Sequence, residues 1–108
     1  MAKLEKTLSG DFDALLERIE NGILSGSSTA SLEDKSDFTG SNSRCSVRVF
    51  ERYSATGSNR LSLSLTLFQD ETGIIKLSAI TAGGSKGMLF KINTLGEDAF
   101  LDKLSELI

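Results

Sequence analysis

The stretch from Arg60 to Ala82 constrains the fold of this chain most, because it carries the clearest strand pattern in the sequence. Leucine occupies every second position from Leu61 to Leu67 and alternates with serine and threonine, which places all the leucines on one face of a strand. A second apolar run, Ile74–Thr81, follows a polar segment that ends in Gly73. The stretch is therefore predicted to form a β-hairpin with one apolar face.

The alternation also predicts how the strands pair. Facing residues of an antiparallel pair point to the same side of the sheet, so a loop with an odd number of residues would place Leu67 opposite Leu77. In the preceding hairpin, a register with Arg52 opposite Arg60 would bring like charges together. We therefore expect Arg52 to lie opposite Ser62.

Periodicity predicts the remaining elements. Apolar residues at helical spacing follow Asp11 and recur at the C-terminus, so two amphipathic helices are expected. Asn21-Gly22 is expected to stop the first helix, and Thr94 begins a capping box for the second. The expected elements are a strand over 2–9, a helix from about Asp11 to about Glu20, strands over 30–38 and 44–53, the hairpin, and a helix over 94–108.

This β-α-β-β-β-β-α order predicts the topology of the chain. Sequential antiparallel strands usually neighbour one another, so the last four strands should form a meander, with the first strand added beside the fifth. The expected fold is a two-layer α+β domain over residues 1–108. Its curved five-stranded antiparallel sheet has the strand order 1-5-4-3-2, and both helices cover one face.

The faces of the other strands follow from the same reasoning. In the strand over 44–53, we expect Cys45, Val47 and Val49 to point toward the helices. Arginines would then lie on the uncovered face, together with Phe50. In the strand over 30–38, the side chains expected to point inward are Ala30, Leu32, Asp34 and Phe38.

Composition excludes several classes of function. Because the chain has no histidine and Cys45 is its single cysteine, it can form neither a Ser-His-Asp or Cys-His nucleophile system nor an internal disulfide. We expect no enzymatic activity, no metal and no other cofactor. The net charge of −3 argues against nucleic acid as the main partner, and no apolar run approaches a membrane span. The N-terminus lacks the apolar core of a signal peptide, which favours the cytoplasm.

The uncovered sheet face is the first candidate site. It would combine basic, hydroxyl and apolar side chains, and so could receive phosphate, an acidic partner or a second copy of the chain. An ordinary solvated sheet face is the alternative. The candidate residues are Arg48, Phe50, Arg52, Ser64, Thr66, Lys76 and Ile80.

A pocket between the sheet and the C-terminal helix is the second candidate. If Asp34 and Glu51 both point inward, they become diagonal neighbours, and one carboxyl pKa would rise. The glycine segment that contains Gly84 and Lys86 could form a nest of backbone N–H groups for an anion. Such a pocket would take a small anionic or lipophilic ligand. The alternatives are that a bulge brings both carboxylates into water and that the glycine segment is a simple bend.

The predicted topology resembles the TATA-box-binding-protein-like fold. The C-terminal run GGSKGMLFKINTLGEDAFLDKL is similar to a family of short uncharacterised bacterial proteins, which implies a bacterial cytoplasmic setting and no known activity. Compared with the DNA-binding members of that fold, this chain is acidic and lacks their paired intercalating phenylalanines. We therefore expect a small soluble binding or assembly domain that forms a homodimer through the uncovered face or an edge strand. The alternative is a domain that binds a small ligand in the pocket.

Overall fold

The computed structural model describes residues 1–53, 59–83 and 99–108. One antiparallel sheet with the order β1-β5-β4-β3-β2 contains all the described strands. Its strands are β1 (Ala2–Leu8), β2 (Ser31–Thr39), β3 (Arg44–Tyr53), β4 (Arg60–Gln69) and β5 (Ile75–Gly83), and the first helix is α1 (Phe12–Gly26). Residues 99–105 are also helical. The predicted α+β architecture and strand order are confirmed.

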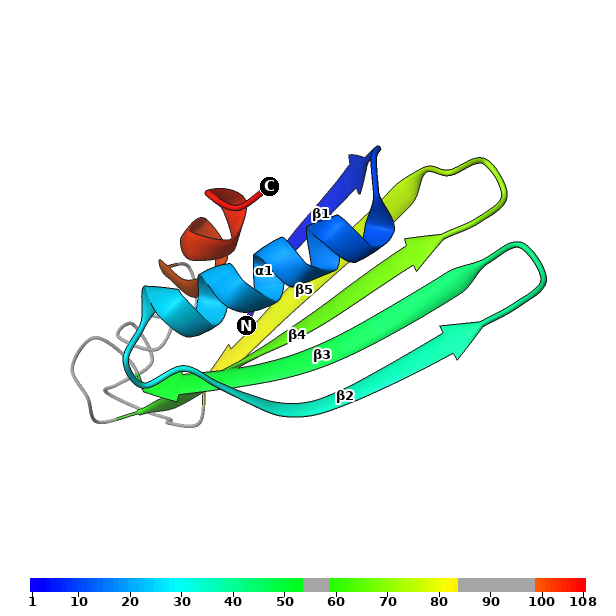
Figure 1. The fold of residues 1–108 in the computed structure, drawn as a ribbon. Coiled ribbons are helices and arrows are strands. Elements are labelled where there is room, and N and C mark those ends of the chain that lie inside the picture. The colour runs from blue at the N-terminus through cyan, green and yellow to red at the C-terminus, as the bar shows by residue number, and fades with distance from the viewer. Residues whose placement is uncertain (54–58, 84–98) are drawn as a thin grey trace.

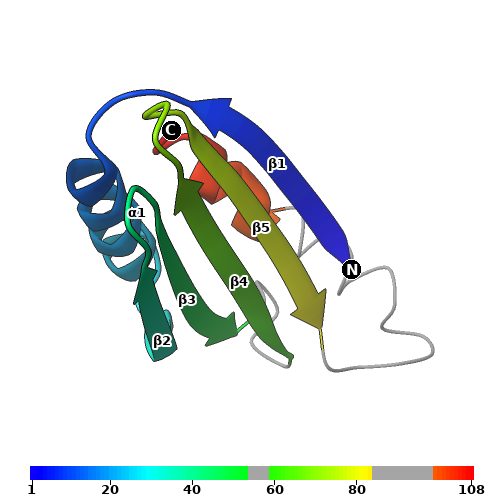
Figure 2. The same cartoon turned by 90° about the vertical axis from the view of Figure 1, so that its right-hand side faces the viewer.

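Both helices lie on the same face of the sheet (Figures 1 and 2). The alternating leucines of β4 are fully buried beneath them, together with Leu77 and Ala79 of β5. From the other layer, α1 contributes residues such as Ile19, and the C-terminal helical segment contributes Phe100 and Leu104. The leucine face of β4 is thus the floor of the core, as its alternation predicts.

The first helix is longer than predicted, because Asn21-Gly22 does not stop it. The apolar stripe continues to Ile23, which is buried. A Cβ atom built on Gly22 would clash with the side chain of Leu107, so this glycine lets the C-terminal segment approach α1 closely. Gly22 is therefore explained by packing rather than by helix termination.

The β4–β5 hairpin has the predicted register. Leu67 pairs with Leu77, and Leu65 pairs with Ala79. Gly73 has a φ of +82°, and its N–H donates a hydrogen bond to the carbonyl oxygen of Asp70 at 3.1 Å. A glycine was needed in the turn because other residues rarely adopt this left-handed conformation.

The β3–β4 register differs from the prediction by one residue, and this inverts the faces of β3. Arg52 pairs with Leu61 rather than Ser62, and Phe50 pairs with Leu63. A shift of one residue moves every side chain of a strand to the other face. The physical reason is Phe50, which is the largest apolar side chain of β3 and is 0% exposed in the core. Consequently Arg44, Ser46, Arg48, Phe50 and Arg52 lie on the covered face, whereas Cys45, Val47 and Val49 lie on the uncovered face.

Strand β2 contains a register shift between Leu32 and Asp34 that changes which residues point inward. Leu32 packs against the core, as predicted, and Asp34 pairs with Val49, also as predicted. However, Val49 lies on the uncovered face, so Asp34 lies there too. Phe38 pairs with Cys45 on the same face and is 62% exposed. The prediction that Asp34 and Phe38 point inward is wrong.

Some predicted features fall outside the described residues. These are the Thr94 cap, Gly84 and Lys86. Among the helices of the described part, none is both long and apolar enough to cross a membrane.

Candidate functional site

Three arginines of β3 share the covered face of the sheet. We call Arg44, Arg48 and Arg52 the arginine row; they are spaced by four residues, which separates neighbours by roughly 13 Å along a strand. Charged side chains are rarely placed beneath helices unless they are paired. The partners of each arginine therefore indicate what it does.

Arg48 joins three elements of the fold. Its side chain is 7% exposed, and its Nε donates to Oε1 of Glu20 on α1 at 2.6 Å. Its Nη1 donates to Oδ1 of Asp37 on β2 at 3.0 Å and to the carbonyl oxygen of Val47 at 2.9 Å. The hydroxyl of Ser46 donates to the same Asp37 oxygen at 2.7 Å. This network ties α1 and the edge strand β2 to the middle of the sheet.

The charges in this network stabilise one another. Burial alone would lower the pKa of Arg48, but its hydrogen bonds and charge contacts with Glu20 and Asp37 outweigh burial and raise that pKa above its usual value. The hydrogen bond from Ser46, followed by that from Arg48, lowers the pKa of Asp37. Arg48 is saturated by protein groups, so its role is structural.

Arg44 is also paired, with a carboxylate in the first turn of α1. Its Nη1 and Nη2 donate to the two carboxylate oxygens of Asp13, at 3.1 and 2.7 Å. Its guanidinium carbon lies 4.1 Å from the centre of the Phe12 ring. The hydrogen bonds from Arg44 lower the pKa of Asp13. Within the protein, Arg44 thus uses the face of its guanidinium and its two terminal nitrogens, whereas its Nε is buried without a hydrogen-bond partner among the described residues.

Arg52 differs from the other two members of the row. Its guanidinium carbon lies 4.3 Å from the centre of the Phe100 ring, but no described carboxylate forms an ion pair with it. Its Nε is buried and has no hydrogen-bond partner in the described part of the chain, as is also true of Arg44, so the missing carboxylate is what distinguishes Arg52. Burial lowers the pKa of Arg52.

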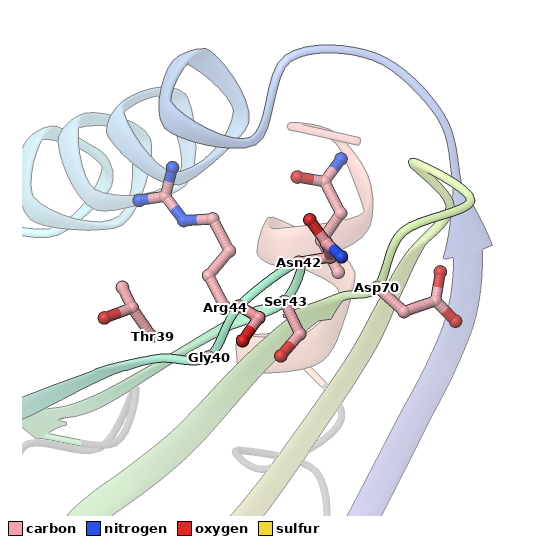
Figure 3. A pocket seen from close by; sticks show the side chains of 8 residues that line it. Thr39, Gly40, Asn42, Ser43, Arg44 and Asp70 are labelled. Atoms are coloured by element: carbon pink, nitrogen blue, oxygen red, sulfur yellow. The ribbon is translucent and has the colours of Figure 1, made fainter.

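A small polar hollow lies beside the start of β3 (Figure 3). Its volume is about 280 Å³, at the lower limit for ligand pockets, which are mostly apolar. The Arg44 side chain in Figure 3 points toward α1, where Asp13 holds it, and Asp70 points away from Arg44. The lining residues are Thr39, Gly40, Ser41, Asn42, Ser43, Arg44, Gln69 and Asp70. Arg44 is the one cation among these lining residues, and it is already paired with Asp13. The hollow therefore has no free cation with which to bind a ligand.

The uncovered face carries a set of partly exposed apolar side chains. Phe38, Cys45 and Phe68 are cross-strand neighbours on β2, β3 and β4, and Phe68 is 39% exposed. We call the whole set the open-face patch; it consists of Phe38, Cys45, Val47, Val49, Phe68 and Ile80. Exposed apolar groups that adjoin one another, as Phe38, Cys45 and Phe68 do, are typical of interaction surfaces, whereas single ones are ordinary; Ile80 is separated from Val49 by Ser64.

The predicted interface residues divide between the two faces. The alternation of β4 and β5 correctly places Ser64, Thr66, Lys76 and Ile80 on the uncovered face. The prediction that Arg48, Phe50 and Arg52 lie there is wrong, since all three lie under the helices. The sequence interpretation missed Val47 and Val49, and it placed Cys45 in the core, although this free thiol is only half-buried. Had Phe50 been assigned to the core, the alternation of β3 would have placed Cys45, Val47 and Val49 on the uncovered face.

The two predicted pocket carboxylates also lie on the uncovered face. Asp34 is exposed, and its Oδ1 accepts a hydrogen bond from the backbone N–H of Lys35. Glu51 forms an ion pair with Nε of Arg60 at 2.9 Å. Neither carboxylate therefore points between the sheet and the helices, so the prediction that Asp34 and Glu51 line a pocket there is wrong. Within the described ranges, no three His, Cys, Asp or Glu side chains are grouped so that they could hold a metal ion.

Sequence comparison places the whole chain in one family. No curated protein matches this sequence. A family model described as a family of unknown function, DUF6054, matches residues 1–108. The chain therefore belongs to DUF6054.

Proposed function

We propose that this protein is a binding and assembly domain that forms a homodimer through the open-face patch. The observation that carries the proposal is the patch itself, which crosses β2, β3, β4 and β5 on the face that the described helices leave uncovered. Replacing the predicted arginines of this face by Cys45, Val47 and Val49 makes it more apolar than the sequence interpretation supposed. Burying such a surface against a second copy would be favourable.

The edges of the sheet are less suited to association than its face. Edge strands that avoid pairing often carry inward-pointing charges or bulges. On β1, Lys6 pairs with Leu77 and so points to the covered side; on β2, Lys35 does the same opposite Arg48. Strand β2 is also irregular between Leu32 and Asp34. We therefore favour face-to-face association over the addition of strands at an edge.

The proposed partner is a second copy of the chain, because one row of cross-strand neighbours on the uncovered face is complementary to itself. Asp34, Val49, Ser64, Ile80 and Lys3 are successive cross-strand partners from β2 to β1. A two-fold axis parallel to β4 would place Ser64 against its own copy, Val49 against Ile80, and Asp34 against Lys3. The charges at the two ends have opposite sign, so the same axis pairs both of them. Phe68, on β4, would meet its own copy.

Sedimentation equilibrium of matched variants tests the proposal. We expect the wild type to be a dimer and Phe68→Glu to be a monomer, because the proposed two-fold axis would bury this charge against the same charge of the second copy. Leu24→Glu is the matched control, since Leu24 on α1 is exposed to the same extent as Phe68, 39%, but lies outside the patch. A wild type that stays monomeric at the highest attainable concentration, or a Phe68→Glu variant that remains a dimer, would contradict the proposal.

Charge exchange tests the arrangement of the two copies. Asp34→Lys and Lys3→Glu should each weaken the dimer by placing like charges opposite one another, whereas the double variant should restore it. Lys3 already contacts Glu5 at 2.9 Å, but such exposed pairs contribute little and exchange readily. If the double variant is as weak as the single ones, the two-fold axis does not lie along β4.

A further inference from the structure

We propose that Arg52 is the recognition residue of an anion-binding site, which takes a carboxylate or phosphate group of a ligand at the C-terminal end of β3. This site lies on the covered face, so it is separate from the open-face patch and does not depend on dimer formation.

The comparison with Arg44 shows what Arg52 lacks. Each of these arginines stacks on a helix aromatic, Arg44 at 4.1 Å from Phe12 and Arg52 at 4.3 Å from Phe100. Phe12 is followed in sequence by Asp13, which accepts two hydrogen bonds from Arg44. Phe100 is followed by a leucine, which has no acceptor to offer. At one end of β3 an internal carboxylate therefore meets the arginine, whereas at the other end none of the described residues supplies one.

Burial makes the unmet need of Arg52 significant. Its Nε has no access to solvent and no hydrogen-bond partner in the described part of the chain; the same is true of Arg44, but there the carboxylate of Asp13 balances the charge, and no described carboxylate does so for Arg52. A cation that is partly removed from water without a counter-charge is costly, which is why burial lowers the pKa of this group. The side chain as a whole is only half-buried, so an anion can still reach it. Binding an anion would offset the cost of desolvation.

The orientation of the guanidinium selects the class of ligand. Stacking on Phe100 occupies a face of the group, and its Nε is buried, so a ligand would meet the edge formed by the two terminal nitrogens. Such a planar edge matches two oxygens of one carboxylate or one phosphate group. The neighbours of Arg52 on the same face, Phe50 and Leu61, are apolar and fully buried, so they offer no competing charge.

Anion titrations of the intact protein test this site. Sodium phosphate and sodium acetate are added at constant ionic strength against sodium chloride, while the melting temperature and the Nε–Hε NMR signals of arginine are followed. We expect at least one of the two anions to raise the melting temperature and to shift the Arg52 signal, with the Arg44 signal unchanged. A response to phosphate alone assigns a phosphate ligand, and a response to acetate alone assigns a carboxylate. If neither anion shifts the Arg52 signal, the proposal is wrong.

Variants locate the response. Arg52→Met should weaken the binding of the effective anion by about tenfold or more, since charge-assisted hydrogen bonds are lost. Arg44→Met should leave the binding unchanged, because Arg44 is already paired. Arg52→Lys keeps the charge but not the planar edge, and should bind less tightly than the wild type. Full binding by Arg52→Met would overturn the proposal, and if that variant fails to fold, the wild-type NMR titration still decides.

Discussion

Arg48 and Arg52 project from the same face of one strand, yet their surroundings differ completely. Arg48 reaches two carboxylates and a backbone carbonyl, whereas Arg52 reaches only an aromatic ring among the described residues. Both are long side chains that cover apolar surface with their methylene groups. An arginine on the covered face thus cross-links the fold where carboxylates accept its donors, and in the proposed anion site it stays available to a ligand because no described carboxylate does so.

The largest effect should come from removing the cross-link. We expect Arg48→Met to destabilise the fold by about 2–3 kcal/mol, because it leaves the carboxylates of Glu20 and Asp37 without their cation. The value lies below that of a fully buried pair, since Asp37 is 54% exposed and can be solvated. Urea unfolding measures the change. The variant for comparison is Arg52→Met. In chloride buffer this variant should be at least as stable as the wild type, because it removes a partly buried cation that no described carboxylate balances.

If Arg52→Met costs as much as Arg48→Met, the two arginines do not differ as described. A second check uses double-mutant cycles. The coupling of Arg48 with Glu20 should exceed its coupling with Asp37, because Glu20 is 27% exposed and Asp37 is 54% exposed.

Acid should reveal an intermediate effect. The folded-state pKa of Asp37 lies below its ordinary value of 3.8, so the stability that this carboxylate contributes is present above pH 3.8 and is lost as pH falls through the lower folded value. We expect the difference in urea midpoint between the wild type and Asp37→Asn to shrink as pH is lowered from 5 to 2.5.

The Asp37→Asn comparison isolates one carboxylate among several that titrate in the same range. Asp13 and Asp70 also have lowered pKa values, caused mainly by hydrogen bonds from Arg44 and Thr72 respectively, but they titrate in both proteins. A difference in midpoint that stays constant with pH would show that Asp37 contributes no pH-dependent stability.

Among the variants that remove a paired arginine, Arg44→Met should have the smaller effect. The Arg44 side chain is 37% exposed, and the contact of its guanidinium with the Phe12 ring is expected to contribute about 0.5–1 kcal/mol. Arg44→Met should therefore lower the urea midpoint less than Arg48→Met does. Raising the salt concentration should narrow the gap between wild type and Arg44→Met further, because exposed charges are screened. A loss equal to that of Arg48→Met would contradict the distinction between buried and exposed pairs.

Much of the fold could be predicted because the alternation of β4 is unambiguous. Its leucines leave one choice of face, and that choice fixed the register with β5 and the positions of Ser64, Lys76 and Ile80. The alternation of β3 is ambiguous. From the pattern alone, either the face with Val47 and Val49 or the face with Phe50 could point into the core. Phe50 decides the matter through its size.

The arginine row could not be predicted from its own strand. An arginine beneath a helix is acceptable only where a carboxylate meets it, and for Arg48 those carboxylates come from Glu20 and Asp37, on two other elements. Only the tertiary arrangement brings them together. The end of α1 was misplaced for a similar reason, since Gly22 is explained by Leu107, which lies far away in sequence.

The inward-pointing lysines of β1 and β2 have a consequence for stoichiometry. A sheet that could accept strands at its edges would add copies without limit and grow into a fibre. With Lys6 at one edge and Lys35 at the other, growth in that direction is disfavoured, and in the proposed dimer each copy would cover the open-face patch of the other. The same two side chains would therefore cap the assembly at two subunits and keep it finite at any concentration.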